Sequence, residues 1–223
     1  MESKGYSADT PMASSAAVVK VDLACGDNKQ DGHIGVDYRK TESVDLVMDL
    51  EVYPWTFTSE SVDELYCSHY VEHLPHDNTM PMVKEMVKRS KSFADFKKQV
   101  SEIDASKPTD SLIKFMDECY RILKPGGKLT ILTPYYSSMR AVQDPTHTRS
   151  MCEASFLYFN RQWRIDNKLD HYNIMCDFDF NYGYNVNNAW MPRSEESRNF
   201  AFLHYNNVIT DIQVVLTKNS SLV

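Results

Sequence analysis

Glycine is scarce in this chain, and its scarcity limits the ways in which a nucleotide can be bound. Only 7 of the 223 residues are glycine. No Gly-x-Gly-x-x-Gly run follows any predicted strand, so the fingerprint of the dinucleotide-binding proteins is absent. A turn with a single glycine can still let a ligand approach the backbone, and a nucleoside site of another design therefore stays open.

The chain also lacks an excess of positive charge and long apolar runs. Its formal net charge of −7 argues against a surface that wraps nucleic acid, although a local basic patch is compatible with that value. No segment has the long apolar run of a transmembrane helix. The first residues lack the charged start and apolar centre of a signal peptide. We expect no membrane partner and no nucleic-acid partner.

Cysteine pairs are missing too. The five cysteines are scattered, with no Cys-x-x-Cys pair and no zinc-site spacing, at positions 25, 67, 119, 152 and 176. An odd number of widely spaced cysteines fits reduced thiols better than a disulfide framework. We therefore expect a cytoplasmic location.

The length and composition fit one ordinary globular domain. Hydrophobic residues make up 42% of the chain and charged residues 25%. Residues 1–17 are rich in serine and alanine without a clear period, which predicts a flexible N-terminal tail. Residues 18–223 are expected to form the single domain.

The first half of that domain reads as short strands with brief connections. Apolar runs predict strands at 18–24, 34–36, 44–48 and 62–67, the last followed by a turn of helix rich in acidic residues and histidine. Only the segment 25–32 separates the first two strands. That length is short for a complete crossover helix between parallel strands.

A helical insertion interrupts this pattern at about 78–108, where apolar residues recur at helical spacing and lysines occupy the opposite positions. A second amphipathic helix covers 112–123. The breaker Lys-Pro-Gly-Gly at 124–127 is expected to end it and to return the chain into a strand at 128–133. We interpret the basic face of the insertion as solvated, with a lid over an anionic acceptor or a dimer contact as alternatives.

The C-terminal half predicts two more strands. Strict alternation over 174–186 indicates a long strand with one wet face, and 208–216 is the last strand. Between them and the earlier strands, one helix face is expected from Phe156, Tyr158, Phe159 and Trp163. The sum is an α/β fold with a mostly parallel sheet, an antiparallel edge strand and flanking helices.

The most informative local feature is the pair of segments Val21-Asp-Leu-Ala-Cys-Gly26 and Gly35-Val-Asp37. A strand ends in a turn of small residues, and the next strand ends on a carboxylate. Such a turn lets a ligand approach the backbone, and such a carboxylate can accept hydrogen bonds from both hydroxyls of a ribose. These segments favour a nucleoside ligand.

Four segments, in the same order along the chain, give this pattern a family resemblance. They are Val21–Gly26, Met48–Phe57, Ser61–Leu74 and Tyr120–Ile131. With them, residues 18–135 outside the insertion resemble the class I S-adenosylmethionine-dependent methyltransferases, specifically the type 11 methyltransferase domain family. The resemblance implies a Rossmann-like fold and S-adenosyl-L-methionine as cofactor.

The resemblance also implies roles for individual residues of the cofactor site. The turn after the first strand would lie against the methionine part of the cofactor, through Asp22, Ala24, Cys25 and Gly26. Asp37 would take the ribose hydroxyls. Ala24 stands where the family usually has a glycine, and its methyl group is tolerated if the φ angle there is negative.

Further residues are assigned to the adenine and the reacting centre. Tyr38 would line the adenine, and Asp49 with Leu50 would meet its edge. Ser68 and His69 would lie beside the sulfonium and the incoming acceptor. All of them follow the carboxyl ends of strands, where ligands bind in open α/β sheets.

Two histidine-containing segments are candidates for the chemistry. In the first, His147 with Asp144 could remove a proton from the acceptor, and Arg149 could bind an anionic group of it. A loop tied together by its own hydrogen bonds is an equally weighted alternative. Tyr135 and Tyr136 are candidates to line the acceptor pocket, with plain packing as the alternative.

In the second, His69 is a candidate base. His69 and His73 also have a spacing that can hold a metal on a helix, but a third ligand is not evident, so we expect no metal site.

The sequence therefore predicts a methyltransferase acting on an oxygen or nitrogen of a small molecule, with residues 136–207 shaping the acceptor pocket. A nucleic-acid or protein methyltransferase is an alternative. Against it, the fourth strand leads into Cys67-Ser-His-Tyr70 and not into the Asn/Asp-Pro-Pro-aromatic turn of amino-directed DNA enzymes. A non-catalytic cofactor-binding module and an aminopropyl transferase are further alternatives. The acceptor, expected to be anionic if the basic insertion is a lid, and the oligomeric state, including a homodimer, stay open.

Overall fold

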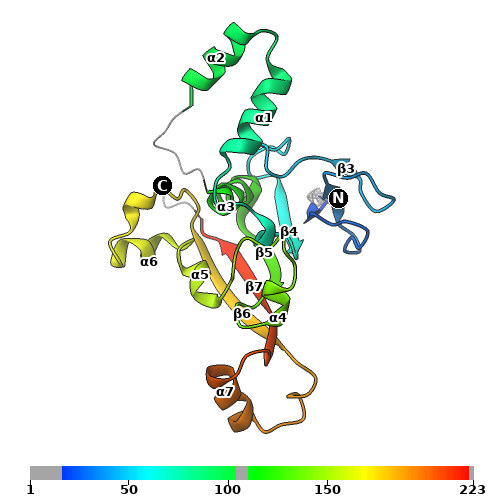
Figure 1. Cartoon of the computed structure of the whole chain (residues 1–223), viewed down its shortest axis with the longest axis vertical. Coiled ribbons are helices and arrows are strands. Elements are labelled where there is room, and N and C mark those ends of the chain that lie inside the picture. The colour runs from blue at the N-terminus through cyan, green and yellow to red at the C-terminus, as the bar shows by residue number, and fades with distance from the viewer. Residues whose placement is uncertain (1–16, 104–109, 221–223) are drawn as a thin grey trace, which may run out of the picture.

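The computed structural model describes residues 17–103 and 110–220, and its centre is a seven-stranded sheet (Figure 1). The strand order is β3-β2-β1-β4-β5-β7-β6. The bounds are β1 Lys20–Leu23, β2 Ile34–Asp37, β3 Leu46–Val47, β4 Val62–Ser68, β5 Leu123–Pro134, β6 Phe178–Val186 and β7 Ile209–Lys218.

The pairing is parallel from β3 to β5, and β7 runs antiparallel to both of its neighbours. β7 lies between β5 and β6, one place in from the edge. The predicted α/β fold with a mostly parallel sheet and an antiparallel part at one edge is confirmed. The N-terminal tail predicted for 1–17 lies, except for residue 17, outside the described residues.

Hydrophobic burial explains why these segments are strands and what covers them. Alternate and adjacent side chains of the central strands are fully buried, among them Val21, Leu65 and Ile131. Helix α3, Ser111–Ile122, covers one face with apolar residues at helical spacing. Burial of each large side chain contributes about 1.5–3 kcal/mol, so this face fixes α3 on the sheet. The Asp110 carboxylate caps its first turn by accepting the N–H groups of Leu112 and Ile113.

The predicted helical insertion is present as two helices, α1 Thr79–Arg89 and α2 Phe93–Ser101. They form an arm that projects from the sheet, at the top of Figure 1. Neither helix has a buried residue. The last part of the predicted insertion, 104–108, lies outside the described residues.

The remaining helices are short. They are η1 Val71–His73, α4 Met139–Val142, α5 Glu153–Leu157, α6 Arg161–Asp166, η2 Asp170–Tyr172 and α7 Glu195–His204. Between β1 and β2 the chain makes only turns, as the short connection suggested. Among the residues described, no helix is long and apolar enough to cross a membrane.

Three predicted strands are shorter than the sequence suggested. The predicted strand 18–24 spans only Lys20–Leu23. The predicted strand 44–48 is reduced to Leu46–Val47. The predicted strand 174–186 begins only at Phe178. The N–H groups of Met175 and Cys176 donate to the Asp117 carboxylate on α3 and so do not join the sheet, which explains the late start.

Two predicted boundaries are also wrong. β5 begins at Leu123, directly after α3, so the segment 124–127 lies inside the strand and does not precede it. The extra residues are accommodated by a register shift opposite Val62 and Glu64 and by a positive φ of 76° at Gly126. The single helix face expected over 156–163 is divided between α5 and α6, because Asn160 caps α6 by accepting the N–H of Trp163.

Candidate active site

The turn after β1 has the open form that a ligand needs, but by a different backbone conformation from the one expected. Ala24 has a φ of 57° and Gly26 a φ of 53°. The condition of a negative φ at Ala24 is therefore not met, and this residue is held in the left-handed region that favours glycine. Beside Gly26 no heavy atom lies within 4 Å of the position that a Cβ would take, so this side of the turn is open.

Asp37 ends β2 and joins it to this turn. Its Oδ2 accepts the N–H of Gly26 at 3.0 Å, and its Oδ1 accepts the N–H of Arg39 at 2.9 Å. Each carboxylate oxygen has a second lone pair for a further donor such as a ribose hydroxyl. The open turn beside an oriented carboxylate therefore fits the nucleoside part of S-adenosylmethionine.

Asp22 and Cys25 serve the turn itself. The buried Asp22 carboxylate accepts the N–H of Gln30 at 2.8 Å, and burial raises its pKa. Burial likewise raises the pKa of the Cys25 thiol to about 11, so this thiol is neutral near pH 7. The resemblance assigned Asp22 to the methionine part of the cofactor and did not indicate its hydrogen bond within the turn.

The residues assigned to the adenine differ in exposure. Tyr38, directly after Asp37, is 76% exposed. Asp49 is exposed, and its carboxylate accepts the N–H of Glu51 at 3.0 Å. Leu50 is buried, and its carbonyl accepts the indole N–H of Trp55.

The end of β4 holds the candidate base in a defined orientation. Ser68 is the last residue of the strand, and His69 follows with a φ of 52° and a hydrogen bond from its N–H to the carbonyl of Leu132. Its Nδ1 lies 3.3 Å from Glu72 Oε1. If that carboxylate is ionised it can only accept, so the proton of a neutral His69 is on Nδ1 and Nε2 keeps a free lone pair.

Two buried carboxylates lie around His69: sequence reasoning noted Glu72 only as a neighbour of the histidines, and it missed Asp211. Glu72 is 1% exposed and accepts the hydroxyl of Thr133 at 3.0 Å. Asp211, on β7, is 3% exposed and forms an ion pair with Arg140 at 2.7 Å through Oδ2. Its Oδ1 has no hydrogen-bond partner among the described residues. An acidic residue inside the apolar strand Ile209–Lys218 was the available signal for Asp211.

The loop with Asp144 and His147 packs against η1. His147 Nδ1 lies 3.1 Å from the carbonyl of Ala141, and its Nε2 lies 4.0 Å from Asp144 Oδ2. The Asp144 carboxylate accepts the N–H and the hydroxyl of Thr146, which lower its pKa. The ring of His147 meets that of His73 edge to face, with centroids 4.6 Å apart.

Arg149 has a structural position instead of the expected place in an acceptor clamp. Its side chain is 8% exposed. The guanidinium donates to the carbonyls of Leu74 and Pro75 at 2.6 Å each and to Asp110 at 3.0 Å. Because these acceptors occupy the guanidinium, we assign Arg149 to the attachment of this loop.

The two tyrosines after β5 have different environments. Tyr135 is 6% exposed, and its hydroxyl donates to Glu153 at 3.1 Å. Burial raises its pKa. Tyr136 is 54% exposed, and its ring centroid lies 4.8 Å from that of Tyr135. Tyr136 is therefore the one that can reach a ligand in solution.

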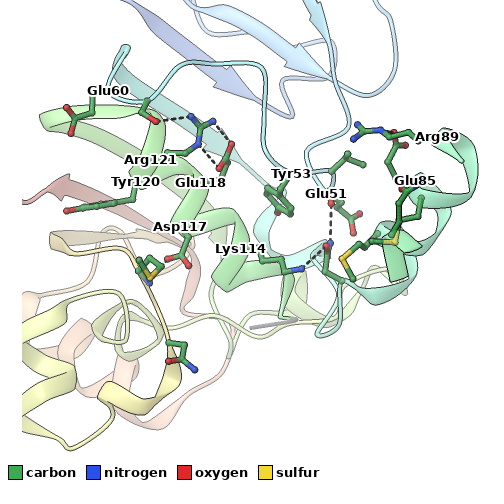
Figure 2. Close-up of a pocket in the computed structure, with 18 of the residues that line it drawn as sticks. Glu51, Tyr53, Glu60, Glu85, Arg89, Lys114, Asp117, Glu118, Tyr120 and Arg121 are labelled. Carbon is green, nitrogen blue, oxygen red and sulfur yellow. Dashed lines mark hydrogen bonds and ion pairs between the residues drawn. The ribbon is translucent and has the colours of Figure 1, made fainter. Parts of the chain in front are cut away.

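A cavity of about 1120 Å³ lies elsewhere, between the α1–α2 arm and α3 (Figure 2). None of the site residues predicted from the sequence lines it. Two of its cations are already paired, since Arg121 donates to Glu118 at 2.6 Å and Lys114 to Asn78 at 3.5 Å. Glu51 Oε2, by contrast, has no hydrogen-bond partner among the described residues. Because most of the cofactor residues predicted from the sequence gather at the ends of β1, β2 and β4 and not in this cavity, we place the candidate site at those strand ends.

Comparison with known proteins bears on the fold. No protein-family model and no curated protein matches the chain. A solved structure of a SAM-dependent methyltransferase from Archaeoglobus fulgidus is similar over 90% of this chain and 86% of its own, with 17% identity and a TM-score of 0.54.

Two others superpose less closely. An S-adenosylmethionine-dependent methyltransferase from Mesorhizobium loti has 12% identity and a TM-score of 0.45, over 93% of this chain and 94% of its own. A putative type 11 methyltransferase from Sulfolobus solfataricus has 14% identity and a TM-score of 0.40, over 92% and 86%. The strand order and the similarity to the Archaeoglobus structure lead to one conclusion: this chain has the Rossmann-like fold of the class I S-adenosylmethionine-dependent methyltransferases.

Proposed function

We propose that this protein is a methyltransferase that uses S-adenosylmethionine to methylate an oxygen or nitrogen of a small molecule. The observation that carries the proposal is the position of His69 between two buried carboxylates at the end of β4. Nδ1 lies 3.3 Å from Glu72 Oε1, and Nε2 lies 3.9 Å from Asp211 Oδ1. Asp37 and the open turn at Gly26 lie at the same carboxyl end of the parallel strands.

The cofactor residues proposed are those of the turn and the two following strand ends. Asp37 would bind the ribose hydroxyls and Gly26 would let the methionine part approach. Ala24, Cys25, Tyr38, Asp49, Leu50 and Ser68 stay as proposed contacts around them. When bound, S-adenosylmethionine supplies an activated methyl group, so the protein has to align the acceptor and remove its proton.

His69 is proposed as the base for that proton. Glu72 fixes the ring and leaves the Nε2 lone pair available, as the orienting carboxylate does in other histidine-dependent sites. Asp211 Oδ1 lacks a hydrogen-bond partner among the described residues and lies across the gap from Nε2. A hydroxyl or amine placed there would donate one hydrogen to Asp211 or to His69. Tyr136 and the region 136–207 are proposed to shape the rest of the acceptor pocket.

The test is a screen for methyl transfer from labelled S-adenosylmethionine to small hydroxyl and amine compounds, beginning with anionic ones. Each hit is measured again with His69→Ala, Glu72→Gln and the control His171→Ala. We expect His69→Ala to lower kcat by about 100-fold or more while cofactor affinity stays within about twofold. Turnover that survives His69→Ala would contradict the role of His69. Cofactor binding without turnover of any compound would favour the non-catalytic binding module.

A further inference from the structure

Glu72, His73 and His147 form a cluster of metal-ligand side chains that the sequence spacing did not reveal. One ligand atom of each lies within 4.8 Å of the others. Glu72 and His73 belong to η1, and His147 comes from the loop after α4. The sequence had suggested the pair His69 and His73, but His69 precedes η1 and its ring turns to Glu72 and Asp211.

The hydrogen bonds of both histidines leave Nε2 free when the rings are neutral. The carbonyl of Ala141 can only accept, so Nδ1 of His147 carries the proton in their 3.1 Å contact. The hydroxyl of Thr146 donates its hydrogen to Asp144 at 2.7 Å. It must then accept from Nδ1 of His73, 2.9 Å away. Metal-binding histidines characteristically donate their other ring N–H to an oxygen in this way.

The backbone holds the two segments together before any ion is present. The carbonyl of Glu72 accepts the N–H groups of Thr148 at 2.8 Å and Arg149 at 3.2 Å. His76 Nε2 lies 3.1 Å from the carbonyl of Thr148. The attachment of Arg149 to Leu74 and Pro75 adds to these bonds. The ligands are therefore supported by a fixed backbone, which a precise metal site requires.

The charge of Glu72 gives an independent indication. Its side chain is 2% exposed, its Oε1 lies 3.3 Å from Nδ1 of His69, and in the described parts of the chain no lysine or arginine pairs with it. A carboxylate buried without a cationic partner is unfavourable. A bound cation would stabilise it.

We propose that Glu72, His73 and His147 bind a divalent transition-metal ion, with Zn²⁺ as the first to test. Two imidazole nitrogens and one carboxylate oxygen are a common zinc ligand set. Tetrahedral coordination places ligand atoms about 3.3 Å apart, so small side-chain rotations must bring the present cluster together. Asp144 Oδ2 lies 4.0 Å from His147 Nε2, beside this cluster and not part of it. The ion would crosslink η1 to the loop 144–149. This inference does not depend on the proposed methyl transfer.

The test begins with the full-length protein freed of metal by a chelator. Titration with Co²⁺ is followed by visible absorption, which reports tetrahedral coordination, and Zn²⁺ is then used to displace it. We expect one equivalent to bind and Zn²⁺ to raise the melting temperature. His73→Ala and His147→Ala should each lower the Co²⁺ affinity by about 100-fold or more, whereas His171→Ala should leave it unchanged. Thr146→Val, which removes the oxygen that orients His73, should cost about 10–100-fold.

Circular dichroism and melting of the metal-free variants establish that each one folds. No tetrahedral Co²⁺ spectrum with the wild type would overturn the proposal. Two other results would also overturn it: Co²⁺ binding that is unchanged in His73→Ala and His147→Ala, or an intense sulfur-to-cobalt absorption band. Either result would place the ion on other residues.

Discussion

Asp211 Oδ1 lies 3.9 Å from His69 Nε2. Asp211 belongs to strand β7, and His69 directly follows strand β4. Because β4 pairs parallel with β5 and β5 pairs antiparallel with β7, the end of β4 and the start of β7 lie at the same end of the sheet. Because Glu72 holds the other ring nitrogen, the structure predicts which tautomer His69 adopts. This tautomer decides whether His69 can act as a base toward a group beside Asp211.

We expect the neutral His69 ring to carry its proton on Nδ1. The measurement is long-range nitrogen–proton correlation NMR on protein labelled with ¹⁵N-histidine, with His69→Gln used to assign the signal. In Glu72→Gln the carboxylate acceptor of this bond is lost, and a mixture of tautomers should appear. A wild-type ring protonated on Nε2 would contradict the orientation on which the proposed base depends.

Ala24→Gly should stabilise the protein. The φ of 57° at Ala24 costs an L-residue about 1–2 kcal/mol, which glycine avoids. The greater conformational entropy of an unfolded chain with glycine offsets part of this gain. The expected net gain in the free energy of unfolding is about 0.5–1 kcal/mol, measured by urea denaturation. Ala94→Gly, in the exposed helix α2, is the control of opposite sign and should destabilise by up to about 1 kcal/mol. A loss of stability in Ala24→Gly would mean that the turn does not hold this residue in the left-handed region.

Arg149→Met should destabilise the fold and leave cofactor affinity nearly unchanged. It removes the donors to Leu74, Pro75 and Asp110 from a site that is 8% exposed. We expect a loss of about 2–3 kcal/mol in the free energy of unfolding. Arg89→Met, which breaks an exposed ion pair with Glu85, should cost less than about 0.5 kcal/mol. An Arg149→Met protein of normal stability whose only defect is a raised KM for the acceptor would restore the clamp expected from the sequence.

The cysteines should differ sharply in reactivity. All five are free, and Cys152 alone is not buried. Burial raises the pKa of Cys25 to about 11 and holds those of Cys67, Cys119 and Cys176 well above the usual range. Iodoacetamide at pH 8 should therefore modify Cys152 first, as located by mass spectrometry.

The pH dependence of that reaction follows from the same shift. A thiol with a raised pKa stays neutral to higher pH, so the rate at Cys25 should still be rising at pH 10, where the rate at an ordinary thiol has levelled off. Equal rates at Cys25 and Cys152 at pH 8 would show that the Cys25 thiol is less buried than the structure describes.

The sequence predicted the fold well because its signals are local. Apolar runs marked the strands, and helical spacing marked α3 and the α1–α2 arm. Errors arose where a side chain redirects the backbone: Asp117 takes the N–H groups that would have extended β6, and Asn160 divides α5 from α6. Propensity and period cannot show the Asp117 bonds, since their partners are distant in sequence. The Asn160 cap is local, and the apolar spacing across it hid the boundary.

The site was predictable only in part, for a related reason. Asp37 and His69 end or follow strands, which a pattern in the sequence can mark. Asp211 joins them only through the position of β7, and His147 reaches His73 only through a loop folded back on η1. The role of Arg149 depends on two main-chain carbonyls, which leave no trace in a sequence.

The most direct test of the account is calorimetric titration of the protein with S-adenosylmethionine and S-adenosylhomocysteine. Asp37→Ala and Asp27→Ala are titrated beside the wild type. The two substitutions remove the same charge, but Asp37 is buried at the end of β2, whereas the Asp27 side chain is 67% exposed. We predict micromolar binding by the wild type and by Asp27→Ala, and a loss of about 100-fold in Asp37→Ala, equal to about 2.7 kcal/mol from two lost hydrogen bonds to a carboxylate. Normal affinity in a folded Asp37→Ala protein, or no binding by the wild type, would contradict the cofactor site.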